Sequence, residues 1–482
     1  MKTLLALLLV AVATASVAAP AVSPRHGPRN GIEVVRRWNQ IAIDASGLDH
    51  TPVAVGENRV FGEQIGPCRA SRALAIVHIA MFDAVNAVVG EYESYTGVRA
   101  DSGPLSMEAA IASAAHDTLV VLFPSQKAAF DARLAADLKS IDNPKAKANG
   151  IDLGGRAAAA ILVLKAEDGS QIPEPRVGID YLTSDLAGHW RQDPISLIPL
   201  ALGAQWSQCK PFVLQSASQF RVPPPPAMET PAYAAAFNEV KRLGGDGITT
   251  LTERTPEQTF IGVYWAYDGT PSLCAPPRLY NQITLQIADQ MGSSDIEVAR
   301  LLTLVNVAMA DAGSAVWDSK YYYDFWRPIT GIREADSATG YIGDENPATT
   351  GDPTFSPLGA PASNLASGKN FTPPFPAYPS GHAGFGGALF QTLRNFYGTD
   401  RISFTFVSDE FNGVTRGAGG NIRPLVPRTF SSLSQAEEEN GQSRIYLGIH
   451  WSFDKTAGIA QGRQVADHVF ANTFRPNRRA GR

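Results

Sequence analysis

The feature that most constrains the fold of this 482-residue chain is the helical periodicity of its apolar residues. In the first such segment, residues 31–45, Ile32, Val35 and Trp38 recur close to the 3.6-residue spacing of an α-helix. The same periodicity predicts further helices over 71–89, 107–123, 126–141, 145–167, 230–243, 255–266, 279–290 and 294–317. Strand-like alternation occurs only at 402–407, so we expect one short strand at most. These patterns predict a mainly α protein of two packed helical bundles.

A proline run indicates where the two bundles are divided. Residues 169–219 are rich in glycine, proline and serine and show no helical pattern. Pro223 to Pro226 then form a stiff, extended connector. We therefore expect an N-terminal helical bundle region over 20–222 and a C-terminal helical bundle over 223–482. Long irregular connections would join the helices, and the functional site would lie in the second bundle.

The first 19 residues have the features of a signal peptide. Lys2 is followed by an unbroken apolar run over 4–13 and by small residues over 16–19. This run is shorter than the roughly 20 apolar residues that a membrane-spanning helix needs. No later stretch reaches that length without charged or turn residues. We expect a secreted or periplasmic protein with no stable membrane insertion, and the alternative is an N-terminal anchor that is not removed.

The overall charge argues against a nucleic-acid partner. Lys+Arg 41 against Asp+Glu 46 give a net charge of −5, so no global positive field attracts polyanions. Any anion that the protein binds must therefore be held by a local cluster of cations.

The cysteines leave two alternatives open. Cys68, Cys209 and Cys274 are widely spaced and show neither a CxxC pair nor a zinc pattern. One disulfide with one free thiol would suit an oxidising compartment, and Cys209–Cys274 is then the favoured pair. Three buried structural cysteines are the other alternative.

The first segment that could have a chemical function contains two cations seven positions apart. Lys320 and Arg327 would lie on one face of a helix, with Arg327 near its end or at a kink, because Pro328 does not continue a helix comfortably. The surrounding aromatic residues are Trp317, Tyr322, Phe325 and Trp326. An isolated pair of this kind is usually solvated, but cations among so many aromatic rings are expected to be partly buried and to need a partner.

The second segment is a proline-rich stretch that runs into a helix of small residues. Ser380 has the position of an N-cap, so free backbone N–H groups and the positive end of the helix dipole would lie just after it. Gly381 would let a ligand approach the backbone closely. His382 would be within reach of that ligand and can transfer protons near neutral pH. For this segment alone, a capped helix with a histidine in its first turn would be the commoner case.

The third segment joins a cation to a histidine and a carboxylate. His450 and Asp454 are four residues apart, so on a helix the carboxylate would hold one imidazole nitrogen and leave the other free. Arg444 precedes them, and Gly458 and Gly462 indicate close helix packing. Of the other histidines, His26, His50, His116, His189 and His468 are interpreted as surface or loop residues and His78 as a core residue.

Taken together, three cations, a helix N-terminus and two histidines predict a site for a small tetrahedral oxyanion. The patterns K-x6-R-P, P-S-G-H and S-R-x5-H-x3-D occur here in this order and resemble the signature of the type 2 phosphatidic acid phosphatase superfamily. The longer context, from about 255 to 470, resembles vanadium chloroperoxidases. The resembling stretches are residues 264–269, 276–282, 310–313 and 373–378.

This resemblance implies a vanadium-dependent haloperoxidase that oxidises halide with hydrogen peroxide to hypohalous acid, with small organic molecules as halogen acceptors. His450 would be the axial ligand of vanadate, His382 the acid–base residue and Lys320 the residue that polarises bound peroxide. The vanadate oxygens would be bound by Lys320, Arg327, Ser380, Gly381 and Arg444. Trp317 and Phe375 would form the halide pocket, Asp268 would pair with Arg444, and Asp454 would support His450. Bromide-preferring relatives often have histidine at the position of Phe375, so chloride as well as bromide is expected.

Two alternatives remain at this stage. The same atoms would serve an acid phosphatase in which His450 forms a phosphohistidine and His382 protonates the leaving oxygen. The other is a non-catalytic oxyanion-binding protein, against which the presence of both histidines argues.

Overall fold

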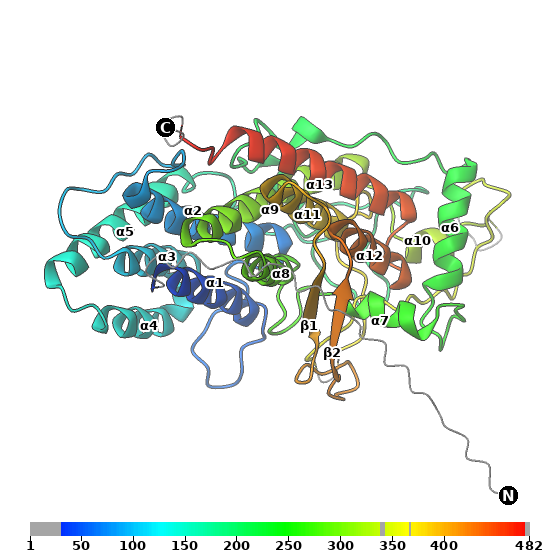
Figure 1. The fold of residues 1–482 in the computed structure, drawn as a ribbon. Coiled ribbons are helices and arrows are strands. Elements are labelled where there is room, and N and C mark those ends of the chain that lie inside the picture. The colour runs from blue at the N-terminus through cyan, green and yellow to red at the C-terminus, as the bar shows by residue number, and fades with distance from the viewer. Residues whose placement is uncertain (1–29, 338–342, 366–367, 478–482) are drawn as a thin grey trace, which may run out of the picture.

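The computed structural model describes residues 30–337, 343–365 and 368–477. Within these residues the chain forms thirteen α-helices and one two-stranded sheet (Figure 1). The N-terminal helices are α1 (Asn30–Asp49), α2 (Gly66–Val89), α3 (Met107–Leu122), α4 (Lys127–Lys139) and α5 (Pro144–Leu164). Next come α6 (Pro231–Leu243), α7 (Pro256–Tyr264), α8 (Pro277–Gln290), α9 (Asp295–Tyr323) and α10 (Pro328–Arg333). The last are α11 (Gly381–Tyr397), α12 (Leu433–Tyr446) and α13 (Ser452–Asn472).

The mainly α fold predicted from the periodicity is therefore confirmed, and each predicted helical segment contains an α-helix. Several of these helices begin as their sequences predict. Ser106, Asn143 and Thr230 accept hydrogen bonds from the first turns of α3, α5 and α6, as N-cap residues do. The predicted signal peptide, residues 1–19, lies outside the described residues.

Helix α9 is the central element of the fold. Nearly every residue from Ile296 to Lys320 is buried, because α9 packs against α1 and α2 as well as against α8, α11 and α13. Figure 1 shows α9 between α2 and α11. One continuous cluster of buried apolar side chains extends from Val34 to Phe474 and includes both halves of the chain. The boundary between residues 222 and 223 stays a prediction.

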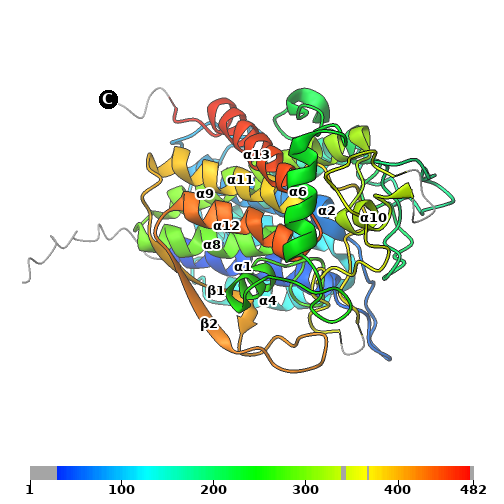
Figure 2. The same cartoon turned by 90° about the vertical axis from the view of Figure 1, so that its right-hand side faces the viewer.

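Helices α11 and α13 lie very close together, as Gly458 and Gly462 predict. A Cβ atom at Gly458 would lie 2.6 Å from the carbonyl oxygen of Ser380, and one at Gly462 would overlap the carbonyl oxygen of Gly384. Figure 2 shows α13 and α11 side by side with α12. This packing holds the N-terminus of α11 against the start of α13.

The sheet is a hairpin instead of a single strand. β1 (Phe404–Asn412) pairs antiparallel with β2 (Leu425–Phe430), with Phe404 opposite Phe430. The expectation of one strand at most was wrong. Only Phe430 of β2 is buried, and Pro427 interrupts the apolar alternation, so the sequence of β2 lacks the strand pattern.

The three cysteines are buried and free, so the disulfide alternative was wrong. The sulfur of Cys274 lies 2.8 Å from the hydroxyl of Ser46, whereas Cys209 directly follows the short 3-10 helix Trp206–Gln208. Among the described residues, α2 alone is long and apolar enough to cross a membrane. However, 78% of its most apolar window is buried inside the protein, as expected for a core helix.

Candidate oxyanion site

Lys320 and Arg327 come together through a turn of the chain and not along one helix. Helix α9 ends at Tyr323, because Asp324 adopts the left-handed conformation with φ 50°. Arg327 is extended and forms the N-cap of α10, so Pro328 occupies the first position of a new helix. The prediction that a single helix presents both cations was therefore wrong, although the prediction that they are buried is right.

Lys320 is held in place by backbone carbonyl groups and aromatic rings. Its Nζ donates to the carbonyl oxygens of Pro376 at 2.7 Å and Ala377 at 2.9 Å. The same atom lies 5.1 Å from the ring centre of Phe375 and 5.7 Å from that of Trp317. The ammonium group has three N–H donors, so one remains for a ligand.

Arg327 is fixed by two other carbonyl groups. Nε donates to the oxygen of Phe375 and Nη1 to that of Ile449, both at 2.8 Å. Nη1 also donates to Nε2 of His450 at 2.9 Å. The second terminal nitrogen, Nη2, is buried and has no hydrogen-bond partner in the described part of the chain.

The N-terminus of α11 lies where the P-S-G-H pattern predicts. Ser380 is the N-cap, with its hydroxyl accepting a hydrogen bond from Ala383. The backbone N–H of Ser380 donates to the carbonyl oxygen of Asp454 at 3.0 Å, which ties α11 to α13. A Cβ atom at Gly381 would lie 3.2 Å from the ring of Trp317, so glycine suits this crowded position.

His450 has a defined tautomer. Nδ1 donates to Asp454 at 2.8 Å, and Nε2 therefore carries the lone pair that accepts from Arg327. The predicted pairing with Asp454 is confirmed, but His450 lies two residues before α13 instead of on it. Asp454 is the third residue of α13 and also accepts from the backbone N–H of Trp451 at 3.0 Å.

Arg444 and His382 share Asp268. Nη2 of Arg444 donates to Asp268 at 2.6 Å, as predicted. The other nitrogens of Arg444, Nε and Nη1, are buried without a partner among the described residues. Nε2 of His382 donates to the carbonyl oxygen of Ala266 and lies 3.9 Å from the same carboxylate. Ala266 lies in the resembling stretch 264–269, but the sequence assigned it no role, because only its backbone takes part.

Burial makes this cluster electrostatically unfavourable when no ligand is bound. Desolvation, with nearby Arg327, holds the pKa of Lys320 well below its usual value, and desolvation lowers the pKa of Arg327 itself to about 9. The pKa of Asp454 is raised to about 7 by burial. Burial and Arg444 keep the pKa of His382 well below 6.5, so its ring is neutral.

The unpartnered donors and the excess of buried cations indicate the kind of ligand that fits. Lys320, Arg327 and Arg444 are opposed by only two carboxylates, Asp268 and Asp454, within the described site. An oxyanion would accept from the three unpartnered guanidinium nitrogens and offset the repulsion among the cations. The residues therefore fit a small tetrahedral oxyanion, such as phosphate or vanadate.

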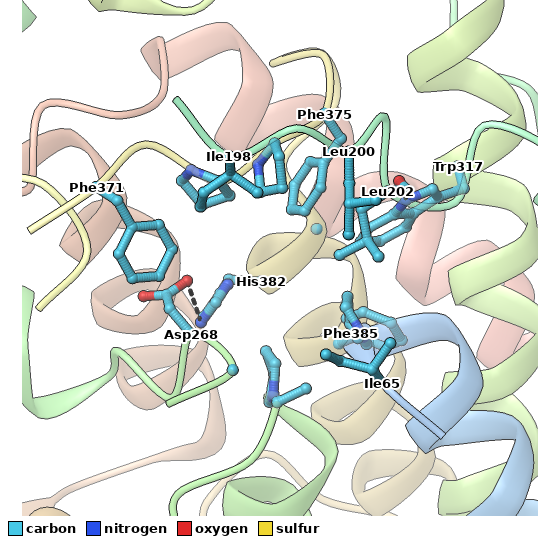
Figure 3. A pocket seen from close by; sticks show the side chains of 18 of the residues that line it. Ile65, Ile198, Leu200, Leu202, Asp268, Trp317, Phe371, Phe375, His382 and Phe385 are labelled. Atoms are coloured by element: carbon cyan, nitrogen blue, oxygen red, sulfur yellow. Dashed lines mark hydrogen bonds and ion pairs between the residues drawn. The ribbon is translucent and has the colours of Figure 1, made fainter. Parts of the chain in front are cut away.

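A pocket of about 180 Å³ opens beside this cluster. Figure 3 shows His382 and Asp268 at its polar end, while Trp317 and Phe375 line its apolar part. Their ring centres are 4.9 Å apart. His50 also lines the pocket. It lies in the turn directly after α1, so it is a loop residue as one of the two interpretations had it, but its side chain is buried and the surface interpretation was wrong. Its ring bonds to the backbone of Ser46 and Gly66, contacts that no sequence motif indicates.

The fold and this cluster define a class of helical proteins with a buried cationic site that fits a tetrahedral oxyanion. Residues 300–478 match a family model described as the VCPO second helical-bundle domain. The chain is 30% identical over 511 aligned residues to the vanadium chloroperoxidase of Curvularia inaequalis, across 87% of this chain and 78% of that protein. The chain belongs to the vanadium-dependent haloperoxidase family.

Solved structures show the same fold at lower sequence identity. The first bacterial vanadium-dependent iodoperoxidase aligns over 93% of this chain and 98% of its own, with a TM-score of 0.71 and 23% identity. A bacterial vanadium-dependent chloroperoxidase in its apo form covers 83% of this chain and 92% of its own, with a TM-score of 0.61 and 16% identity. These structural similarities support the helical fold described above.

Proposed function

We propose that this protein oxidises chloride or bromide with hydrogen peroxide to hypohalous acid, using vanadate as its cofactor. The main support is the group of buried guanidinium nitrogens that have no partner among the described residues and lie beside the unprotonated Nε2 of His450. Membership of the family supports the same activity. Small organic molecules would accept the halogen.

The residues of the cluster fit vanadate in the way that the sequence motifs predict. Lys320, Arg327 and Arg444 would bind its oxygens, together with Ser380 and Gly381 at the start of α11. Nε2 of His450 would bind the metal, with Asp454 holding the ring through Nδ1. Bound vanadate would supply Lewis-acid activation of hydrogen peroxide.

His382 would move the proton of the peroxide. Its Nε2 donates to Ala266, so the neutral ring has its lone pair on Nδ1, ready to accept a proton. The carboxylate of Asp268, 3.9 Å from Nε2, would stabilise the charged ring that results. Lys320 would donate its remaining N–H to the peroxide oxygen and draw electron density from it.

The halide would approach along the aromatic wall. Trp317 and Phe375 line the pocket next to Nζ of Lys320. An anion in this position would meet an ammonium group in apolar surroundings, where the attraction is stronger than in water. Phe375 in place of histidine supports chloride as well as bromide as a substrate.

The test is a vanadate titration with two assays in parallel. Full-length protein freed of vanadium is titrated with orthovanadate, and halogenation of a diketone is followed with peroxide and either bromide or chloride. Cleavage of p-nitrophenyl phosphate is measured on the same samples. We expect halogenation to rise with vanadate to saturation at one equivalent, and absence of halogenation would refute the proposal.

The phosphatase alternative depends on the same atoms and is decided by this experiment. His450 would attack phosphorus through Nε2 and His382 would protonate the leaving oxygen. Phosphate ester cleavage that vanadate only inhibits, with no halogenation, would assign the site to an acid phosphatase. Vanadate binding with neither activity would instead indicate an oxyanion-binding protein.

A further inference from the structure

A strained turn of the backbone lies directly beside His382. Helix α7 ends at Tyr264, and three residues later Tyr267 has φ 45°, in the left-handed region. Asparagine, aspartate and glycine reach this region readily, whereas a residue as bulky as tyrosine seldom does. The conformation costs free energy and persists only where the surrounding structure fixes it. Because such strain clusters at functional sites, the contacts of this turn indicate its role.

The two neighbours of Tyr267 in the chain both approach the imidazole ring of His382. The carbonyl oxygen of Ala266 accepts a hydrogen bond from Nε2 of His382. Oδ1 of Asp268 lies 3.9 Å from the same nitrogen, and Figure 3 shows these two side chains facing each other. Since Tyr267 joins Ala266 to Asp268, its backbone conformation sets the position of both acceptors relative to the ring.

The side chain of Tyr267 attaches the turn to two other elements. Tyr267 is fully buried, and its hydroxyl donates to Oε1 of Gln282 on α8 at 3.2 Å. The same hydroxyl accepts from the backbone N–H of Asp409 on β1 at 2.6 Å. Nε2 of Gln282 donates in turn to the carboxylate of Asp409 at 2.9 Å, which closes the network. One phenolic oxygen therefore fixes the turn to both α8 and β1.

We propose that Tyr267 is a positioning residue for His382. Its anchored side chain maintains the strained turn, and the turn aims the carbonyl oxygen of Ala266 and the carboxylate of Asp268 at Nε2 of His382. These two acceptors keep the proton of the neutral ring on Nε2, so that Nδ1 carries the lone pair. This inference rests on the proposed function, in which Nδ1 accepts the proton of the peroxide. Tyr267 acts through His382 and is not itself a catalytic residue.

The tautomer of His382 tests this inference without turnover. Full-length protein with isotope-labelled histidine is studied by nitrogen NMR in the absence of peroxide and halide, and the spectrum of His382→Ala assigns the signals of His382. We expect the wild type to hold the proton on Nε2. Tyr267→Phe keeps the aromatic ring but removes the hydroxyl, which leaves two buried partners unpaired and releases the turn. We therefore expect a mixture of the two tautomers of His382 in this variant.

Tyr264→Phe is the matched control. Tyr264 is equally buried, lies on the same segment and donates its hydroxyl to the carbonyl oxygen of Phe406 on β1 at 2.9 Å. The two substitutions therefore remove the same group and should lower the melting temperature by similar amounts. Only Tyr267→Phe should alter His382, because only Tyr267 lies at the turn. The same tautomer change in both variants, or in neither, would overturn the inference.

Gln282→Leu tests the same hydrogen bond from α8. This substitution leaves Tyr267 intact but removes the acceptor of its hydroxyl. The bond from the backbone of Asp409 remains, so the change at His382 should have the same direction and be smaller. If Tyr267→Phe does not fold, Gln282→Leu alone decides the inference, and a His382 spectrum identical to that of the wild type would refute it.

Kinetics separate this inference from the proposed function. In vanadate-loaded Tyr267→Phe, kcat for bromide oxidation should fall by about 10-fold to about 100-fold, because a catalytic group displaced by about 1 Å can lose that much. KM for bromide and the vanadate affinity should stay close to those of the wild type, and so should kcat of Tyr264→Phe. A wild-type kcat in Tyr267→Phe would contradict the inference. Absence of bromide oxidation by the wild type would instead refute the proposed function, while the NMR comparison still decides whether Tyr267 positions His382.

Discussion

At the scale of single residues, the two histidines of the site differ in what their nitrogens face. His450 has Nδ1 committed to Asp454 and Nε2 directed at the guanidinium of Arg327. His382 donates Nε2–H to a backbone carbonyl group and carries its lone pair on Nδ1. This difference supports the proposal that His450 binds vanadate and His382 moves the proton, although both are buried among the same cations.

His450→Ala should weaken vanadate binding by at least about 100-fold, beyond the 10–100-fold loss typical of removing a residue that only supports a ligand. His382→Ala should keep binding close to that of the wild type but lose turnover, because no group remains to accept the peroxide proton. Equilibrium dialysis gives the first quantity and the halide oxidation rate gives the second. His468→Ala, at a partly buried position near the end of α13, should change neither. Vanadate binding by His450→Ala at the level of the wild type would remove His450 as the ligand.

The composition of the site was predictable from sequence, but its geometry was only partly so. The spacing of His450 and Asp454 and the resemblance that paired Arg444 with Asp268 both led to hydrogen bonds that the structure contains. The route of the chain to Arg327 was not predictable, because it depends on the left-handed conformation of Asp324. Asp324 in turn bonds to a distant residue, His189. Contacts of this kind are set by tertiary packing and leave no local pattern.

At the scale of elements, the close packing of α11 and α13 positions the site. Ser380 and His382 lie at the start of α11, and the backbone bond from Ser380 to Asp454 joins the two helix N-termini. The two helices can approach because Gly462 leaves room for the carbonyl oxygen of Gly384. A displacement of α13 would therefore alter the distance between His450 and the α11 N-terminus.

Gly462→Ala should lower the free energy of unfolding by about 1–3 kcal/mol, because the added methyl overpacks the helix crossing. Vanadate affinity should fall as well, since the crossing sets the position of the α11 N-terminus. Gly155→Ala in α5 is the control, because a Cβ there would meet only the flexible carboxylate of Asp117, at 3.4 Å. That substitution should be neutral or stabilising by up to about 1 kcal/mol. Thermal denaturation compares the three proteins, and equal stability of Gly462→Ala and the wild type would contradict the prediction.

The helices were predictable at this scale because the helical spacing of their apolar residues continues over several turns. The amphipathic segments at 230–243 and 279–290 correspond closely to α6 (Pro231–Leu243) and α8 (Pro277–Gln290). The ends of the helices were less predictable. Helix α9 continues past Trp317 to Tyr323, where the aromatic residues show a weaker helical periodicity than the preceding aliphatic residues. β2 was not predicted because it has only one buried residue, Phe430, and therefore no apolar alternation.

At the scale of the whole molecule, α9 joins the N-terminal helices to those that carry the site. His78 on α2 is part of this junction. Its Nδ1 bonds to the carbonyl oxygen of Leu74 at 2.7 Å and its Nε2 to Asn39 of α1 at 2.9 Å. Its own carbonyl oxygen accepts from Thr303 of α9 at 3.0 Å. The prediction that His78 is a core residue is confirmed. Because the side chain is buried at this junction, its protonation should affect the stability of the whole fold.

Burial lowers the pKa of His78 from 6.5 to about 4. The unfolded chain therefore binds more protons than the folded protein between these two values, and stability falls as the pH decreases from 6.5 toward 4. His78 alone should cost the wild type about 2.5 kcal/mol between pH 7 and pH 4.5. His78→Gln keeps a polar side chain but does not titrate, so its stability should depend less on pH over this range. Urea denaturation at both pH values measures the difference. An identical loss in the two proteins would show that folding does not lower the pKa of His78, and would contradict the prediction.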